Sequence, residues 1–388
     1  MTGTDEECVD VMIYVQHLLG VGHLSRAAAI ARACGDADLS VTLVSGGLPV
    51  PTLDIGDARL VQLPPLKARD ADFTGLIDES GRPLDEAMKV SRRDRLLACF
   101  EACDPKALIV ELYPFGRRQL RFELEPLIAA ARTRQPRPWL LCSLRDILNP
   151  VSEAKADWAV QQVRESFDRV LVHGDPSMTT LGASFPRAEA IADKLHYTGY
   201  VLETKPSEPA PTNEGAGEVI VSTGGGAVGR ELIDTALAAR PLSPFAEIPW
   251  RILVGSNLPE SDFARARADA PGGVRVERAR PDFQGLLARC RLSVSQGGYN
   301  TVLEVLQAGV PAVIVPFASE GEREQTLRAE TMAAKGLLHH LPAEALSSTS
   351  LAEAMAVAQP PSPGLELDLG GAEKTAKMVR ELVARVPD

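Results

Sequence analysis

Short apolar runs recur along the chain and alternate with stretches in which apolar residues have helical spacing. Nine runs rich in Val, Ile and Leu are each bounded by Gly, Pro or polar residues. They are VMIYVQ (11–16), VTLVSG (41–46), ALIVEL (107–112), WLLCSL (139–144), RVLVHG (169–174), EVIVSTGG (218–225), RILVGS (251–256), RLSVSQGG (291–298) and AVIVPF (312–317). Between them, stretches such as LSRAAAIARAC (24–34) repeat apolar positions on one helix face. Uninterrupted apolar strands that alternate with helices predict parallel sheets covered on both faces, as in a doubly wound α/β protein.

One segment interrupts this alternation and predicts a domain boundary. Residues 203–218 (ETKPSEPAPTNEGAGE) carry three prolines and two glycines, and they lack any apolar period. Five of the apolar runs precede this segment and four follow it. We therefore expect a Rossmann-like domain over 1–202, a linker over 203–217 and a second Rossmann-like domain over 218–388. We expect the amphipathic stretch 370–386 to close the second domain as a helix.

Composition and charge narrow the class of protein. The 388 residues are 45% hydrophobic and 24% charged, as in a soluble globular protein. No apolar run reaches the roughly 18 residues of a membrane-spanning helix, and the first ten residues are acidic, so we expect a cytoplasmic protein. The net charge of −11 disfavours nucleic acid or an anionic membrane as the main partner.

The cysteines show no spacing that predicts a zinc site or a redox motif. No pair has CxxC spacing, and Cys99 and Cys103 share one face of a predicted helix. The six are Cys8, Cys34, Cys99, Cys103, Cys142 and Cys290. We interpret them as small buried hydrophobic residues in a reducing compartment.

Three segments place glycines between a strand and a helix. They are YVQHLLGVGHLSRAA (14–28), VIVSTGGGAVGRELI (219–233) and LSVSQGGYNTVLEVLQAG (292–309). Doubly wound sheets bind ligands at the carboxyl ends of their strands, and free amides at a helix start favour phosphate. The pattern therefore indicates candidate anion sites in both domains, although tight packing alone would explain each glycine turn. Because no GK[ST] follows and GVGHLS ends in serine, the P-loop and the dinucleotide fingerprint are both absent.

Three polar residues near these turns suggest chemistry. His23 follows Gly22 at the predicted mouth of the first strand, where a neutral imidazole takes a proton from a hydroxyl or a water. Glu304 is placed to accept hydrogen bonds from a ribose diol, and Gln325 to bind sugar hydroxyls. The alternatives are a structural histidine, a solvated helix carboxylate and a surface glutamine.

Residues 295–329 (SQGGYNTVLEVLQAGVPAVIVPFASEGEREQTLRA) resemble the C-terminal pattern of glycosyltransferase family 28. This family of GT-B glycosyltransferases includes the enzyme that adds N-acetylglucosamine to form lipid II. The resemblance continues through RPDFQGLLARCRLSV (280–294) and weakly into STGGGA (222–227), and GVGHLSRA (20–27) is similar to the family's N-terminal glycine loop. It implies two Rossmann-like domains that face a cleft, with the acceptor on the N-terminal side and a nucleotide-sugar on the C-terminal side.

The resemblance also implies roles for residues of the second domain. Glu304 would hold the ribose, Gln325 the sugar and the glycines the diphosphate. The implied donor site contains Gly20, Gly22, Gly224, Gly225, Gly226, Arg278, Ala279, Gly297, Gly298, Thr301, Glu304 and Gln325, with Arg278 and Ala279 lining the base. The lipid II enzyme has paired glutamines where this chain has Glu324 and Gln325, so the resemblance does not identify the sugar of the donor.

In the first domain, the resemblance implies that His23 deprotonates the acceptor in an inverting transfer. Glu111 is at the end of a predicted strand, where it would assist this base. The chain has no persuasive DxD motif, so we expect no metal and no cofactor beyond the nucleotide-sugar donor, most simply a UDP-sugar. Arg117, Arg118 and Arg145 follow predicted strands, where they would bind a phosphate or carboxylate of the unknown acceptor. The alternative for these arginines is surface ion pairs and helix caps.

Other functions fit the same residues. The GxGHxxR form, here Gly20, Gly22, His23 and Arg26, also resembles the nucleotide-sugar hydrolase of the pseudaminic acid pathway, in which water replaces the acceptor. A sugar-nucleotide epimerase shares the architecture, and a nucleotide-sugar sensor would bind the donor without turnover. The sequence thus favours a glycosyltransferase and leaves these three alternatives open.

Overall fold

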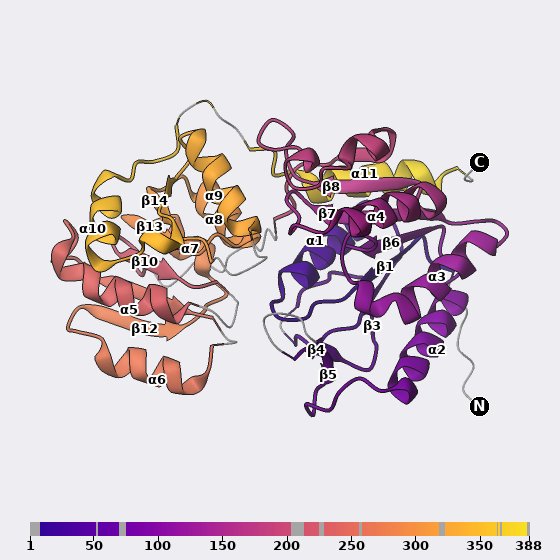
Figure 1. The fold of residues 1–388 in the computed structure, drawn as a ribbon, viewed down its shortest axis with the longest axis horizontal. Helices are drawn as coiled ribbons and strands as arrows, with labels where there is room; N and C mark the ends of the chain where they lie inside the picture. Colours follow the sequence, from indigo (N-terminus) through magenta and orange to yellow (C-terminus); the bar gives the residue numbers. More distant parts are fainter. Residues whose placement is uncertain are drawn as a thin grey trace. The chain divides into compact units, whose positions relative to one another are not determined.

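The chain forms two compact units in the computed structural model (Figure 1). The structure describes residues 8–51, 53–69, 75–202, 213–224, 229–255, 258–317, 323–362, 364 and 367–385. One unit comprises Met1–Glu203 together with Leu367–Asp388, and the other comprises Thr204–Glu366. Most of the predicted linker (203–212) lies outside the described residues, as do Gly225 and Gly226.

The first unit is built on a seven-stranded sheet with the order β3-β2-β1-β6-β7-β8-β9, in which all neighbours are parallel. Its strands are β1 (Val11–Val15), β2 (Val41–Ser45), β3 (Arg59–Gln62), β6 (Ala107–Glu111), β7 (Trp139–Arg145), β8 (Arg169–His173) and β9 (Leu195–Tyr197). A separate antiparallel pair joins β4 (Leu66–Ala68) and β5 (Leu76–Asp78). The strand order reverses between β1 and β6, which is where doubly wound sheets bind ligands.

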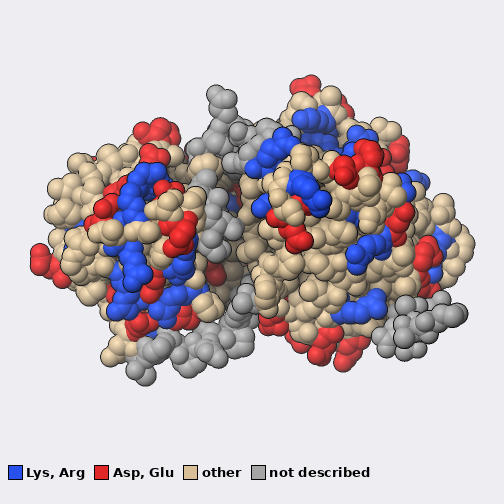
Figure 2. Space-filling view, turned by 90° about the horizontal axis from the view of Figure 1, so that it is seen from below, with Lys and Arg blue, Asp and Glu red and all other residues tan. Residues whose placement is uncertain are grey.

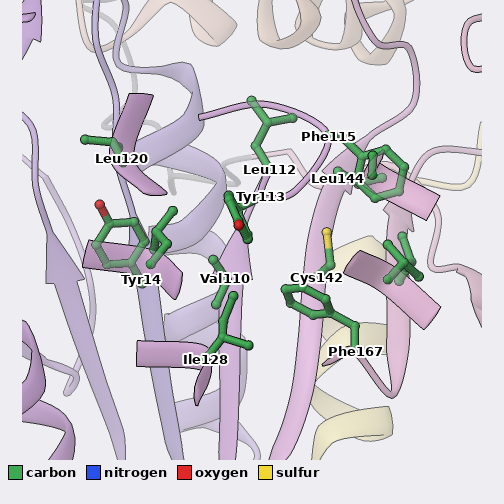
Figure 3. Close-up of a cluster of buried hydrophobic side chains, with 14 of the residues drawn as sticks. Tyr14, Val110, Leu112, Tyr113, Phe115, Leu120, Ile128, Cys142, Leu144 and Phe167 are labelled. Atoms are coloured by element: carbon green, nitrogen blue, oxygen red, sulfur yellow. The ribbon is translucent and has the colours of Figure 1, made fainter. Parts of the chain in front are cut away.

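Helices cover both faces of this sheet, so its central strands are apolar on both sides. They are α1 (Gly22–Asp36), α2 (Glu86–Cys103), α3 (Arg121–Thr133), α4 (Glu153–Ser166) and α11 (Gly371–Val383), with 3-10 turns η1 (Arg118–Leu120), η2 (Leu181–Ala183) and η3 (Ala188–Lys194). Alternate residues of β1 enter two different cores: Ile13 packs with residues of α1 and α11, and Tyr14 with residues of α2 and α3. Figure 3 shows part of the second cluster, where Tyr14, Val110 and Ile128 lie close together.

The C-terminal helix α11 belongs to the first unit, which corrects the prediction that it closes the second domain. Its apolar face, which includes Ala376 and Val379, joins the core that α1 lines. The indole Nε1 of Trp139 donates to the carbonyl of Leu382 over 2.9 Å. The amphipathic period correctly predicted a helix, but an apolar face does not specify which of two domains buries it.

The second unit is built on a six-stranded parallel sheet with the order β12-β11-β10-β13-β14-β15. Its strands are β10 (Val219–Ser222), β11 (Trp250–Val254), β12 (Val274–Arg278), β13 (Leu292–Ser295), β14 (Ala312–Ile314) and β15 (His339–His340). Its helices are α5 (Arg230–Ala239), α6 (Glu260–Asp269), α7 (Phe283–Leu287), α8 (Tyr299–Ala308), α9 (Glu324–Ala334) and α10 (Ser348–Val357), with 3-10 turns η4 (Arg240–Leu242) and η5 (Ala343–Ala345). The strand order reverses between β10 and β13.

All nine predicted runs contain strands, and the strands that the pattern missed lie at sheet edges or in the antiparallel pair. The edge strands β3, β12, β9 and β15 are wholly or largely half-buried or exposed. A strand that faces solvent does not need an uninterrupted apolar run, so the apolar pattern did not reveal it. The fold is therefore of the predicted α/β class, and each sheet has more strands than the apolar runs indicated.

Charged residues of both signs are interspersed on the surface of both units, as the face in Figure 2 shows. In the second unit Arg251 pairs with Glu218 and Glu277, and Arg280 pairs with Glu214 and Asp282. None of the helices in the described ranges combines the length and hydropathy needed to cross a bilayer.

Candidate active site

His23 and Glu111 meet where the order of the first sheet reverses. His23 is the second residue of α1, directly after the loop that follows β1, and Glu111 is the last residue of the neighbouring strand β6. The imidazole Nδ1 of His23 lies 2.7 Å from the carboxylate Oε1 of Glu111. The structure therefore brings together the two residues predicted to be catalytic.

The hydrogen bond fixes the tautomer of the imidazole. An ionised carboxylate only accepts hydrogen bonds, so Nδ1 of His23 carries the proton and Nε2 keeps its lone pair. The guanidinium of Arg26, which is also buried, donates to the same Oε1 of Glu111. Glu111 is 1% exposed, whereas the His23 side chain retains 17% of its surface, so the base is the accessible member of the group.

Burial and neighbouring charges set the protonation states of this group. Burial is the largest influence on His23, and with Arg117 and Arg26 it lowers the pKa of His23 to about 4, although Glu111 opposes this. Burial would raise the pKa of Glu111, but His23, Arg26 and Arg117 outweigh it and lower that pKa to about 2. At neutral pH, His23 is therefore a neutral base beside a carboxylate that remains ionised.

Helix α1 starts without a cap from a side chain. Its N-cap residue Val21 makes no side-chain hydrogen bond, and its first turn holds no acidic residue. Gly22 is the first helical residue, and no atom lies within 4 Å of the position that a Cβ on Gly20 would take. The positive end of the helix is therefore available to a negatively charged ligand, with open space beside Gly20.

Of the three arginines predicted to bind an acceptor, two belong with this group. Arg117 donates through Nε to the carbonyl of Gln16 over 2.8 Å, which holds the side chain at the end of β1. Burial lowers the pKa of Arg117; Glu111 opposes this shift, while Arg145 and Arg26 add to it. Arg118 is not part of this group. Its Nη1 donates to the carbonyl of Phe115 over 3.4 Å, and burial and then the nearby charge of Arg121 lower its pKa.

A buried polar network supports the loop after β1, and the sequence interpretation missed it. The side chains of Arg92 and Glu123 are 0% exposed and are joined by hydrogen bonds of 2.7 and 2.8 Å. Arg92 also donates to Oε1 of Gln16 over 3.0 Å, and Tyr14 donates to Glu123. Because the carbonyl of Gln16 accepts from Arg117, this network links α2 to the candidate site.

A second buried chain follows the carboxyl ends of β7 and β8. Oγ of Ser143 lies 2.8 Å from Nε2 of His173, and Nδ1 of His173 lies 2.8 Å from Oγ1 of Thr198. Ser143 is paired in register with Glu111. A sequence signal for Ser143 and His173 existed, since the second-last residue of three apolar runs is polar: Glu111, Ser143 and His173.

In the second unit, the glycine loops after β10 and β13 approach each other. Gly224 has a φ of +64°, which disfavours a side chain, and its N–H donates to Oγ of Ser222 over 3.2 Å. A Cβ on Gly224 would lie 3.5 Å from Oγ1 of Thr301 in α8. Because β10 and β13 are neighbours at the point where the strand order reverses, these loops occupy the site position of the second sheet.

The start of α8 repeats the arrangement seen at α1. Gly298 is its N-cap without a side-chain hydrogen bond, and its first turn has no acidic residue. Thr301 is buried and Glu304 is half-buried, and their spacing of three residues puts them on one helix face. The helix start and this face thus present amides, a hydroxyl and a carboxylate from one short segment.

Helix α9 braces the Gly297 loop through Arg328, which the sequence interpretation did not single out, and through Glu324, which it named only as a departure from paired glutamines. The fully buried Arg328 donates to Glu324 over 2.7 Å and to the carbonyl of Gly297 over 3.2 Å. A Cβ on Gly297 would lie only 3.1 Å from Cβ of Gln325, so the glycine allows this close packing. Glu324 and Arg328 are four residues apart on one helix, a spacing that is also typical of surface pairs, so it did not predict burial.

The structure places the remaining predicted donor residues as follows. Oε1 of Gln325 accepts from the backbone N–H of Phe317 over 3.0 Å. Arg278 donates to the carbonyls of Gly255 and Leu258, each over 3.0 Å, and its guanidinium lies 4.2 Å from the ring centroid of Phe263. The N–H of Ala279 donates to the carbonyl of Val254 over 2.8 Å. Each therefore has a structural partner at the carboxyl edge of the second sheet.

Among the described residues, no group of three or more His, Cys, Asp or Glu side chains is arranged to hold a metal ion.

Comparison with known sequences finds a family match over most of the second unit. Residues 219–368 match the profile of the glycosyltransferase family 28 C-terminal domain. The UDP-N-acetylglucosamine--N-acetylmuramyl-(pentapeptide) pyrophosphoryl-undecaprenol N-acetylglucosamine transferase of Methylibium petroleiphilum is 32% identical over 193 residues, which are 48% of this chain and 51% of that protein. The NDP-glycosyltransferase YjiC of Bacillus subtilis is 26% identical over 54% of this chain and 53% of that protein. The chain thus spans about half the length of the curated relatives that it matches.

Solved structures extend the likeness to the whole fold. The calicheamicin glycosyltransferase CalG4 superposes with a TM-score of 0.58 at 17% identity, covering 97% of this chain and 94% of that one. MurG of Acinetobacter baumannii superposes with a TM-score of 0.54 at 16% identity, covering 97% of this chain and 95% of that one. The resemblance drawn from residues 295–329 is confirmed: these residues lie within the match to the glycosyltransferase family 28 C-terminal domain, and the chain has the GT-B fold of glycosyltransferases.

Proposed function

We propose that this protein is a glycosyltransferase that moves a sugar from a nucleoside diphosphate donor, a UDP-sugar, to an acceptor hydroxyl. The observation that carries the proposal is the neutral His23, whose Nδ1 is held by the buried carboxylate of Glu111. This arrangement leaves Nε2 of an accessible imidazole as a proton acceptor beside an uncapped helix start. The cytoplasm remains the compartment that we propose.

The transfer is a single displacement. The acceptor hydroxyl gives its proton to Nε2 of His23 while its oxygen attacks the anomeric carbon. The bond from that carbon to the diphosphate oxygen breaks, and the nucleoside diphosphate leaves with the electron pair, so the configuration inverts. Glu111 stabilises the imidazolium that forms, and amide groups of the glycine loops neutralise the leaving diphosphate without a metal.

For the donor, we propose a site at the carboxyl edge of the second sheet. The amides at Gly224, Gly297 and Gly298 bind the diphosphate, and the Thr301 and Glu304 face binds the ribose. Gln325 keeps its amide nitrogen for the sugar, because its oxygen accepts from Phe317. Arg278 and Ala279 hold the segment after β11 by hydrogen bonds, and this segment lines the nucleotide base of the donor.

For the acceptor, we propose a molecule that carries a carboxylate or phosphate group. The guanidinium of Arg117 adds positive charge beside Glu111, beyond the charge of Arg26 that donates to the same carboxylate, and Arg145 lies near enough to Arg117 to lower its pKa. Arginine matches both anions through paired hydrogen bonds. Replacement of Arg117 by Gln is expected to raise the KM for such an acceptor about tenfold and to leave UDP affinity unchanged.

Calorimetry of UDP, TDP, GDP and their sugar conjugates on the full chain, wild type and Glu304→Ala, tests the donor assignment. Selective UDP binding that the variant weakens about tenfold or more supports the proposal. Absence of nucleotide binding by the wild type would overturn it.

Hydrolysis of a nucleotide-sugar is the second candidate, favoured by the direct contact of Arg26 with Glu111 within the GxGHxxR form. Water would then replace the acceptor hydroxyl at Nε2 of His23. Product analysis separates the two reactions: steady UDP release without any acceptor, at the same rate as with acceptor mixtures, identifies a hydrolase.

A further inference from the structure

Two cysteines form a close pair at the end of α2, away from the residues of the candidate site. The sulfurs of Cys99 and Cys103 lie 3.8 Å apart, one helical turn from each other. Cys103 is fully buried and Cys99 is half-buried. Thr42, near the start of β2, and Arg59, at the start of β3, contact Cys103. The pair therefore lies at the amino edge of the first sheet, whereas His23 and Glu111 lie at its carboxyl edge.

Three polar groups converge on the sulfur of Cys103. Nη2 of Arg59 donates to this sulfur over 3.0 Å, the Cys103 thiol donates to Oγ1 of Thr42 over 3.6 Å, and the sulfur of Cys99 lies 3.8 Å away. Within the part of the chain that the structure describes, this sulfur is the one hydrogen-bond acceptor of the Arg59 side chain. A neutral thiol accepts hydrogen bonds weakly, so the guanidinium of Arg59 favours the thiolate of Cys103, to which the Thr42 hydroxyl and the Cys99 thiol would then donate.

The same contacts shift the pKa values of the two thiols in opposite directions. The hydrogen bond from Cys99 is the largest influence on Cys103, and with Thr42 and Arg59 it lowers the pKa of Cys103 to about 6 despite burial. The pKa of Cys99 is raised, first by its hydrogen bond to Cys103 and then by burial. At neutral pH the pair thus holds one proton, on Cys99. Burial instead raises the pKa of Cys34 and Cys290 to about 12.

We propose that Cys99 and Cys103 form a reversible redox site, which a peroxide oxidises to a disulfide within α2. The proposal does not depend on the glycosyltransferase reaction. The thiolate of Cys103 attacks one peroxide oxygen, the O–O bond breaks, and water leaves after protonation, which gives a sulfenic acid on Cys103. The sulfur of Cys99 then attacks that of Cys103, and its proton departs with the sulfenic oxygen as water. Two thiols and one hydrogen peroxide give one disulfide and two water molecules.

The position of the pair in the helix permits this reaction. Cys103 is the last residue of α2, and Asp104 follows it in the left-handed region with a φ of +39°. The sulfurs must approach by roughly 2 Å to reach bonding distance, so the terminal turn has to deform. A helix end deforms more readily than a helix interior. The half-buried Cys99 and the exposed Arg59 give a small oxidant a route to the pair.

The direct test is peptide mapping of the full chain after treatment with equimolar hydrogen peroxide. A Cys8→Ser background removes the exposed thiol, whose sulfur contacts the carbonyl of Asp104. Cleavage after Arg95 and Lys106 leaves both cysteines in one peptide. The expected product is this peptide without two hydrogens, restored by dithiothreitol, while Cys34 and Cys290 stay reduced. Oxidation spread over all cysteines, or none at the pair, overturns the proposal.

Three variants test the pair through the reactivity of Cys103, even where the disulfide itself is hard to isolate. In Cys99→Ala, Cys103 has no partner, so dimedone is expected to trap its sulfenic acid. Replacement of Arg59 by Gln is expected to slow oxidation about tenfold, because a higher pKa leaves less thiolate. Arg93→Gln is the matched control, because Arg93 is on α2 and pairs with Asp94. Equal oxidation rates in both arginine variants contradict the role of Arg59.

Discussion

The two sheets place different chemistry at equivalent positions. Where the first sheet reverses its strand order, the candidate site consists of ionisable side chains: His23 and Arg26 both contact Oε1 of the Glu111 carboxylate. Where the second sheet reverses, the site consists mainly of backbone, with Gly224 facing Thr301 and an uncapped α8. Proton transfer needs a side chain of suitable pKa, whereas binding a diphosphate needs only amides at a helix start. Under the proposed function, one topology positions a base in the first unit and an anion site in the second by the same rule.

Replacement of His23 by Ala is expected to produce the largest effect and to divide the two regions most sharply. Turnover should fall about 10³-fold, because the proton acceptor is lost, while UDP affinity stays the same. Steady-state kinetics and calorimetry on the same preparation measure both. His196→Gln, a half-buried histidine in β9, serves as the control and should retain full turnover. If His23→Ala lowers UDP affinity as much as it lowers turnover, proton transfer and donor binding are not separated between the two regions.

Glu111→Gln should lower turnover by about 10²-fold, since the amide no longer stabilises an imidazolium on His23. The same change leaves the buried Arg26 without its charge partner, so the free energy of unfolding should fall by about 3–5 kcal/mol. Chemical denaturation measures the loss. A Glu111→Gln variant with unchanged stability and full activity would show that neither turnover nor folding depends on this carboxylate.

In the second region, Glu324→Gln should destabilise the protein by about 3 kcal/mol, because the fully buried Arg328 loses its charge partner. Donor KM should rise several-fold as the Gly297 loop loosens, while kcat changes little. The double variant Glu324→Gln with Arg328→Met removes both charges and should recover part of the stability. Failure of the double variant to recover any would contradict the pairing.

Acidification should reduce activity and stability over defined ranges. His23 has a folded pKa of about 4, below its ordinary value of 6.5, so folding favours its neutral form and stability declines as pH falls from 6.5 towards 4. The pKa of Glu111 is also lowered, from 4.5 to about 2, so its stabilisation is present above pH 4.5 and lost as pH falls towards 2. The rate should stay level from pH 8 to about 5 and fall about tenfold per unit below 4. A rate that falls already between pH 7 and 6 contradicts a buried neutral His23.

The smallest expected effect compares two glycines in the second unit. Gly224 and Gly217 have φ angles of +64° and +70°, so replacement of either by Ala should cost about 1–2 kcal/mol through the same backbone strain. Only Gly224→Ala should also weaken UDP binding, by several-fold, because only Gly224 lies beside Thr301. Equal UDP affinities in the two variants would remove Gly224 from the donor site.

The sequence predicted the features that depend on local pattern and missed those that depend on assembly. Uninterrupted apolar runs identified central strands, and the glycine turns that were predicted as candidate anion sites follow β1, β10 and β13, next to the reversal points of the two sheets. The edge strands were missed because half-exposed strands need no apolar run. Arg92 and Arg328 were missed because a buried arginine looks like a surface arginine until its partner, Glu123 or Glu324, is placed beside it. Glu111 was predicted from its place at a strand end, but its bond to His23 depends on β6 lying next to β1.

The return of α11 to the first unit has a consequence for how the chain matures during synthesis. Residues 204–366 are contiguous, so the second unit is able to fold as soon as they leave the ribosome. The core of the first unit stays incomplete until Ala376, Val379 and Leu382 have emerged. The first unit is therefore finished after the second, and the apolar side chains that α11 covers stay exposed to chaperones while the second unit is made.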